Sequence, residues 1–318
     1  VTIGDIKGIG IDILLKSWLN NEFRNFILFS DQKKILRYIK INKLKINLNL
    51  IDLNKNNINF NINKFNVYSY SSKSDEENTY NSLKYAYDFC IKNYCRGIIT
   101  LPLRKDKIIK SIDKKFIGQT EFFQKIDKKK YSNMILFHKK IIISPLTTHI
   151  EINKISKIIT DKKFIYNQLK NLNETLKIDF KIKKPKIVLS GLNPHAGENG
   201  NIGKEEIKFL IPVIKKLKIK GIDIDGPFSA DSILIEKNIK KYNCFVFIYH
   251  DQALIPFKFI SQFTGVNYTG NLNVIRTSPD HGTAYDLIGS KKISNTSFLN
   301  CYKLINTIYK NRVIKDNS

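Results

Sequence analysis

The stretch SGLNPHAGENGNIGKEE, residues 190–206, decides the fold class of this chain. The apolar run 187–189 before it predicts a short buried strand, and the apolar spacing after it predicts a helix over 204–217. The glycines between them predict a tight turn: Gly197, Gly200 and Gly203. A buried strand that passes through a glycine-rich turn into a helix is typical of α/β proteins, which bind ligands at that edge of the sheet.

Three of the five histidines follow predicted strands in the same way. They are His149 after the run 141–143, His195 after 187–189 and His250 after 245–249. Imidazoles that meet at one sheet edge can bind a divalent metal with three protein ligands and one open position. The residues alone leave this interpretation level with a simpler one. Their spacing matches no local metal motif, and a single histidine beside a strand is often an ordinary hydrogen-bonded residue.

The composition is that of a folded protein large enough for two domains. The chain has 318 residues, of which 42% are hydrophobic and 11% aromatic. Its four cysteines show neither zinc spacing nor a disulfide framework, so we expect reduced thiols in a cytoplasmic protein. No apolar run approaches the roughly 20 residues that span a bilayer, and the first residues do not resemble a signal peptide. Because the chain begins at Val1, we expect a few residues to precede it.

The formal net charge of +26 raises the possibility of a nucleic-acid partner. The lysines, however, are spread over nearly the whole chain and alternate with Asn and Ile, as in residues 42–65. No arginine cluster, stacking pattern or nucleic-acid motif accompanies them. We therefore expect no nucleic-acid partner, and an excess charge that helps to attract anionic substrates.

Other segments extend the α/β pattern. Residues 74–77 predict the start of a helix, and the runs 135–137 and 141–143 predict a hairpin. GPFSADS, residues 226–232, predicts a loop, and 297–310 a final helix. Strands that alternate with helices predict layered α/β architecture.

Nine motifs along the chain together carry a family resemblance. In order they are GDIKGIG, TLPLRK, GQTEFF, TTHIEI, GLNPHAGENGNIGKEE, GPFSAD, YHDQALIPFKF, GVNYTGNL and IRTSPDHGTAYDLIG. On these motifs the chain resembles the 4-hydroxythreonine-4-phosphate dehydrogenase family of pyridoxal phosphate biosynthesis, over nearly its full length. LNPHAGE, YHDQ and RTSPDHGTA are its most specific parts.

The resemblance implies a fold and an activity. The fold has two α/β/α domains, as in isocitrate and isopropylmalate dehydrogenases, with the active site in the interdomain cleft at a homodimer interface. The implied domains are residues 1–115 with 256–318, and residues 116–255. The activity is a metal-dependent, NAD(P)-linked oxidation of 4-phosphohydroxy-L-threonine to 2-amino-3-oxo-4-phosphooxybutanoate. That product decarboxylates to 3-amino-2-oxopropyl phosphate, on the route to pyridoxine 5'-phosphate.

The resemblance also assigns site residues. His149, His195 and His250 match the family's ligands for one divalent ion, drawn from both subunits; we expect zinc, cobalt or magnesium. The positions that match substrate contacts are Gln119, Thr120, Lys258, Asn267 and Arg276. A lysine, an arginine and an amide suit an anionic phosphate and carboxylate.

The DHGTAYD segment resembles an adenosine-binding loop, with NAD or NADP as the expected cofactor. Its candidate residues are His281, Gly282, Thr283, Ala284 and Asp286. A purely structural turn is the alternative. The first motif, GDIKGIG, lacks the third glycine of a dinucleotide fingerprint. Asp231 and Asp251 are candidates for the catalytic base, or for orienting a metal ligand, with a helix cap or ion pair as the alternative.

Two departures from the family pattern bear on the substrate. The family histidine in the GHTE motif is Gln119 here, and the first motif carries Ile6, Lys7, Ile11 and Asp12 in place of the usual residues. Glutamine can form a neutral hydrogen bond but cannot become charged near neutral pH. The alternative substrates are related phosphorylated hydroxy acids, a threonate or erythronate phosphate. A remote alternative is a basic nucleic-acid-binding protein without turnover.

Overall fold

The computed structural model describes residues 1–54, 57–288, 290 and 293–313, and the chain forms two compact units. Unit 1 comprises Val1–Phe123 and Asn273–Asn306, and unit 2 comprises Gln124–Leu272 and Thr307–Ser318. The domain limits expected from the sequence were 115/116 and 255/256. Gly289, the last residue of the final motif, lies outside the described residues.

Unit 1 is built on short parallel strands. The strands are β1 (Leu28–Phe29), β2 (Leu48–Leu50), β5 (Phe65–Tyr68), β6 (Ile98–Ile99) and β13 (Arg276–Pro279), with a small antiparallel pair, β3 (Leu53–Asn54) and β4 (Asn57–Ile58). β5 pairs in parallel with β1 and β2, and β6 pairs in parallel with β13. Thr2 connects the two groups, since it bridges in parallel to both Phe29 and Thr100.

The helices of unit 1 begin where the sequence supplies caps. They are α1 (Ile9–Leu19), α2 (Gln32–Ile41), α3 (Asp75–Ile91), α4 (Lys105–Ser111), α5 (Gln119–Ile126), a 3-10 turn η3 (Tyr285–Leu287) and α11 (Thr296–Val313). The expected helix start at 74–77 is confirmed, because Ser74 Oγ accepts a hydrogen bond from Glu77 N at 3.1 Å. Asp31 caps α2 in the same way, by accepting from Lys33 N at 2.9 Å.

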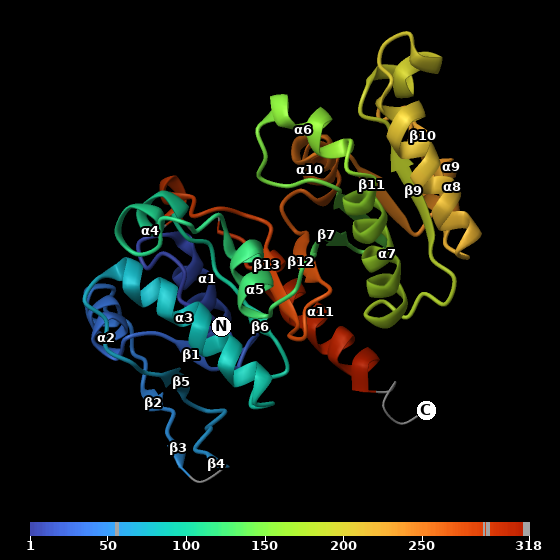
Figure 1. Ribbon diagram of the computed structural model, residues 1–318. Helices are drawn as coiled ribbons and strands as arrows, with labels where there is room; N and C mark the ends of the chain where they lie inside the picture. Colours follow the sequence, from blue (N-terminus) through green and yellow to red (C-terminus); the bar gives the residue numbers. More distant parts are fainter. Residues whose placement is uncertain (55–56, 289, 291–292, 314–318) are drawn as a thin grey trace. The chain divides into compact units, whose positions relative to one another are not determined.

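Unit 2 contains a longer mixed sheet in the strand order β10-β9-β11-β8-β7-β12 (Figure 1). The strands are β7 (Asn133–His138), β8 (Ile141–Pro145), β9 (Lys186–Ser190), β10 (Asp223–Phe228), β11 (Cys244–Phe247) and β12 (Val266–Gly270). The helices are α6 (Ile152–Ile159), α7 (Lys162–Ile178), η1 (Pro194–Gly200), η2 (Glu206–Leu210), α8 (Ile211–Ile219), α9 (Glu236–Lys241) and α10 (His250–Ser261). β10, β9, β11 and β8 are parallel, whereas β7 is antiparallel to both of its neighbours. The predicted hairpin is confirmed as β7–β8, with Leu136 opposite Ile143.

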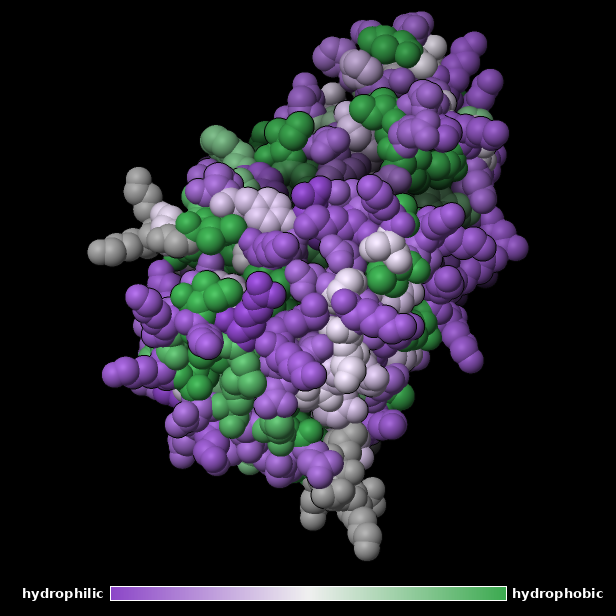
Figure 2. Space-filling view, turned by 90° about the vertical axis from the view of Figure 1, so that its left-hand side faces the viewer, coloured by the Kyte–Doolittle hydropathy of each residue, from purple (hydrophilic) through white to green (hydrophobic). Residues whose placement is uncertain are grey.

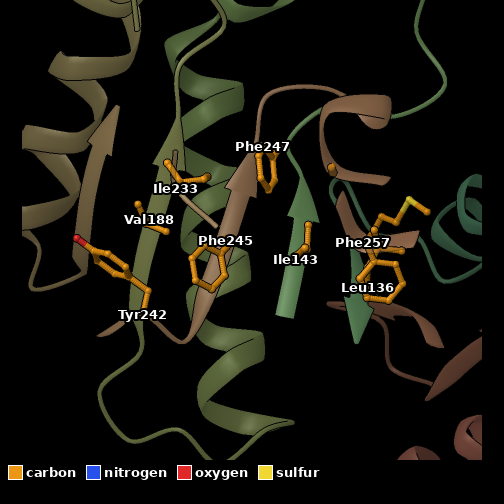
Figure 3. Packing of buried hydrophobic residues seen from close by; sticks show 10 residues of the cluster. Leu136, Ile143, Val188, Ile233, Tyr242, Phe245, Phe247 and Phe257 are labelled. Carbon is orange, nitrogen blue, oxygen red and sulfur yellow. The ribbon is translucent and has the colours of Figure 1, made fainter. Parts of the chain in front are cut away.

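The core of unit 2 holds the strands in register. Phe245 of β11 lies opposite Val188 of β9 on one side and Ile143 of β8 on the other. These three side chains are almost completely buried, and Figure 3 shows them side by side on the sheet. α10 adds Phe257 to the same cluster. Burial of each such side chain stabilises the fold by about 1.5–3 kcal/mol, so the strand ends that carry the histidines stand on a rigid base.

Two local expectations were wrong. The helix expected over 204–217 begins as the π-helical turn η2 and continues as α8 only from Ile211, beside Pro212. A proline cannot donate the backbone hydrogen bond of a regular helix, and this irregularity absorbs that loss. The loop expected at 226–232 begins as strand, because residues up to Phe228 pair with β9.

The surface is hydrophilic over most of the face shown in Figure 2. Among the described helices, none combines the length and the apolar composition that a membrane crossing requires.

Candidate functional site

The ends of three neighbouring strands carry the three predicted metal ligands. β11 lies between β9 and β8 and is parallel to both, so these strands end at the same edge of the sheet. His195, His250 and His149 follow β9, β11 and β8 within a few residues. The expectation that all three follow strands is therefore confirmed.

His149 and His250 lie next to each other, with ring centroids 5.7 Å apart. A zinc–nitrogen distance of about 2.0–2.1 Å places an ion about 3 Å from each ring centre, so this spacing suits two imidazoles on one ion. His250 Nδ1 is 3.0 Å from Asp251 Oδ1. Because a carboxylate only accepts hydrogen bonds, Nδ1 carries the proton in this contact and Nε2 is left for the metal.

His195 stands apart from this pair within the chain. Among the residues that the structure describes, no three His, Cys, Asp or Glu side chains are grouped so that they could hold an ion. His195 is exposed and opens a left-handed run in η1, with φ of 51° at His195 and 56° at Asn199. Left-handed backbone in non-glycine residues costs energy and is concentrated at functional sites. His149, with φ of 47°, shares this conformation.

The turn after β9 is held by a buried carboxylate. Glu206, only 1% exposed, accepts hydrogen bonds from Leu192 N at 2.8 Å and from Asn193 N at 2.9 Å through Oε1. Its Oε2 accepts from Asn193 Nδ2 at 3.0 Å. A Cβ on Gly203 would come within 2.2 Å of the same Asn193 amide, so only glycine fits there.

Gln252 ties the strand ends together. Its Oε1 accepts from Ile248 N at 2.8 Å and from Ser190 Oγ at 3.2 Å, while its Nε2 donates to Gly191 O at 3.1 Å. One side chain thus joins the residues before His195 to those before His250. Sequence reasoning missed both Glu206 and Gln252, although both lie inside the quoted motifs.

In unit 1, Arg276 is buried in a set of polar groups that we call the Arg276 socket: Thr100, Gln119 and Thr120. Thr100 Oγ1 accepts from Arg276 Nε at 3.0 Å and from Nη2 at 2.6 Å. Thr120 Oγ1 accepts from Nη1 at 3.3 Å, and Gln119 Oε1 accepts from Nη2. Burial lowers the pKa of the Arg276 guanidinium to about 10, so it stays charged at neutral pH. Three predicted substrate contacts therefore come together in unit 1.

Gln119 is hydrogen-bonded at both ends of its amide. Besides accepting from Arg276, it donates through Nε2 to Leu101 O at 2.9 Å. Its direct contact with substrate stays a prediction, and its observed contacts orient Arg276.

The other two predicted substrate contacts lie in unit 2. Lys258 is on α10, with Nζ 4.7 Å from the centroid of the Phe263 ring. Asn267 is on β12, and its Oδ1 is buried without a hydrogen-bond partner among the described residues. An acceptor left in this state is suited to a ligand donor.

The predicted cofactor segment packs on the first glycine-rich motif. Thr283 O accepts from Ile9 N at 3.0 Å, and a Cβ on Gly8 would lie 3.0 Å from the same oxygen. Gly282 faces open space, and Asp286 is exposed. Exposed backbone and a free-standing carboxylate suit a ribose hydroxyl. Asp231, one of the two base candidates, is also exposed, on the segment after β10.

Comparisons with known proteins agree with these features. The model of the pyridoxal phosphate biosynthetic protein PdxA family matches residues 22–305. The chain is 33% identical over 305 residues to the 4-hydroxythreonine-4-phosphate dehydrogenase of Sulfurihydrogenibium sp., covering 93% of each chain. It is 33% identical to the Bacteroides thetaiotaomicron enzyme of the same name, covering 98% of this chain and 88% of that one.

Solved structures show the same similarity. The 4-hydroxythreonine-4-phosphate dehydrogenase of Klebsiella pneumoniae superimposes with a TM-score of 0.80 at 25% identity, covering 97% of this chain and 96% of that one. A putative enzyme of that name from Salmonella typhimurium gives a TM-score of 0.82 at 26% identity, covering 96% and 98%. The resemblance seen in the motifs is confirmed: this chain belongs to the pyridoxal phosphate biosynthetic protein PdxA family.

Proposed function

We propose that this protein oxidises 4-phosphohydroxy-L-threonine with NAD or NADP in a metal-dependent reaction. The product, 2-amino-3-oxo-4-phosphooxybutanoate, is a β-keto acid and loses CO2 to give 3-amino-2-oxopropyl phosphate. The observation that carries most weight is the pair His149–His250, 5.7 Å apart at the end of two parallel strands. Family membership supports the same substrate.

The residues have separate roles in this proposal. A divalent ion on these imidazoles lowers the pKa of the substrate hydroxyl, and a bound nicotinamide accepts the hydride. Asp251 orients His250 through the 3.0 Å contact with Nδ1. Asp231, which is exposed to solvent, is the candidate that takes up the hydroxyl proton.

The anionic ends of the substrate need cations and amides. Arg276 offers a guanidinium already fixed in its socket, which lowers the entropy cost of binding. Lys258 and Asn267 supply an ammonium and an amide from unit 2. We propose that these three residues bind the phosphate and carboxylate groups.

We further propose a homodimer in which His195 completes the metal site of the other copy. Two of the three predicted ligands are paired within one chain, and the third is exposed on a separate turn. This division is what a site shared by two copies requires.

The test measures NAD(P)H formation at 340 nm by the chelator-treated enzyme. We expect turnover of 4-phosphohydroxy-L-threonine only after zinc, cobalt or magnesium is added back. Threonate and erythronate phosphates serve as the parallel substrates, because Gln119 departs from the family pattern. Turnover of one of these, with none of 4-phosphohydroxy-L-threonine, would replace the proposed substrate by the alternative.

A further inference from the structure

A second cation lies close to the Arg276 socket in unit 1. Lys105 is the first residue of α4, and it is half-buried. Glu121 lies two residues after Gln119 on α5. Neither Lys105 nor Glu121 is among the substrate contacts considered so far.

Gly118 locates the two charges relative to each other. A Cβ on Gly118 would lie 2.8 Å from Glu121 Oε2 and 3.2 Å from Lys105 Nζ. The carboxylate and the ammonium therefore approach the same point of the backbone, immediately before Gln119. Glycine at this position leaves the space that both groups use.

The charges also act on one another. Partial burial lowers the pKa of the Lys105 ammonium, the Glu121 carboxylate raises it, and the Arg276 guanidinium lowers it further. Glu121 likewise raises the pKa of Arg276. Lys105 and Arg276 are thus near enough to repel each other, with one carboxylate between two cations.

This arrangement leaves one excess positive charge in a place where water is largely excluded. Arg276 is 2% exposed, so its charge is poorly screened by solvent. Two like charges held together in this way are unfavourable unless an anion joins them. An incoming oxyanion would relieve the repulsion and accept hydrogen bonds from both.

We propose that Lys105 is a further substrate-binding residue, which binds an oxyanion of the substrate together with Arg276. The assignment rests on the proposed function for the identity of the substrate. The oxyanion is the phosphate or the carboxylate of the phosphorylated hydroxy acid. A purely structural ion pair between Lys105 and Glu121 is the competing role.

The experiment compares Lys105→Met, Lys105→Arg and a matched control, Lys110→Met, which removes an exposed lysine from the same helix. Binding of inorganic phosphate and of acetate is measured by calorimetry, and KM and kcat are measured with 4-phosphohydroxy-L-threonine. We expect Lys105→Met to raise KM by about tenfold or more, with a smaller change in kcat. Lys105→Arg should recover most of the loss, Lys110→Met should match the wild type, and all variants should melt within a few degrees of it.

The two anions distinguish the sources. Loss of phosphate binding in Lys105→Met assigns the phosphate group, and loss of acetate binding assigns the carboxylate. Wild-type affinity for both anions and wild-type KM in Lys105→Met would overturn the assignment, as would a large fall in melting temperature that Lys105→Arg fully reverses without any change in anion binding. If the wild type turns over no phosphorylated hydroxy acid, the proposed function fails, whereas the anion measurements still decide the role of Lys105.

Discussion

Arg276 is buried and charged, and Thr100 is the residue that satisfies it most directly. Thr100 Oγ1 accepts two of its hydrogen bonds, at 3.0 and 2.6 Å. Thr100→Val keeps the shape of the side chain and removes the acceptor, which should cost about 1–3 kcal/mol of stability. We expect kcat/KM to fall by roughly tenfold to a hundredfold as the guanidinium loses its orientation. Steady-state kinetics and thermal melts check this, with Thr100→Ser as the control that keeps the oxygen; equal kinetics of Thr100→Val and wild type would contradict it.

Gln119 decides how far this chain has departed from its family. Replacing a charge-assisted hydrogen bond by a neutral one costs on the order of 1 kcal/mol, or roughly tenfold in kcat/KM. Gln119→Ala should reduce kcat/KM more than Gln119→His does, because alanine removes the acceptor of Arg276 Nη2 and the donor to Leu101 O. The three versions are compared on the same phosphorylated hydroxy acids. Activity that appears only in Gln119→His would show that the natural chain acts on another substrate.

At the scale of elements, Glu206 links η2 to the turn that carries His195. It accepts three hydrogen bonds from Leu192 and Asn193. Glu206→Gln turns one acceptor oxygen into a donor that faces other donors, so we expect a loss of about 1–3 kcal/mol in the free energy of unfolding. Denaturant unfolding measures this, and the exposed Glu198→Gln in the same turn is the control. A Glu206→Gln variant as stable as the control would show that the turn holds itself.

Asp225 on β10 makes the stability of unit 2 depend on pH. Partial burial by itself would raise its pKa, but hydrogen bonds from Lys218, Tyr242 and Lys241 outweigh this and bring the pKa to about 2. The unfolded value is about 3.9, so the folded state gains stability above pH of about 4. That gain is lost as the pH falls from about 4 to about 2. Asp225→Asn should therefore be less stable than wild type by a constant amount at pH 5–7, and the difference should shrink toward pH 2 in chemical unfolding; a difference that does not change with pH would contradict the ionic origin.

At the scale of the whole molecule, the distribution of the histidines predicts complementation between inactive variants. If His195 serves the other copy, a heterodimer of His195→Ala and His149→Ala contains one intact metal site. Mixing and refolding the two variants should then restore up to about half of the wild-type activity per dimer, together with about one bound ion. Metal analysis and light scattering accompany the kinetics. Absence of both activity and metal in a verified heterodimer would mean that each chain supplies its own three ligands.

The sequence by itself determined the α/β class, the strand ends that carry the histidines and the family. Apolar runs such as 187–189 and 245–249 are local signals of buried strands, and a histidine that follows such a strand stays at the sheet edge whatever the packing. The helix start at Ser74 was equally local, because a hydroxyl and an amide three residues apart make the cap.

Only the tertiary structure decided which of these residues meet. The pairing of His149 with His250 depends on β8 and β11 being neighbours, although about a hundred residues separate them in sequence. The roles of Glu206, Gln252 and Lys105 also come from partners distant in the chain, which side-chain packing alone brings close. Charge and hydrogen-bonding capacity can be read residue by residue, but the partner that satisfies a buried group is set by the three-dimensional arrangement.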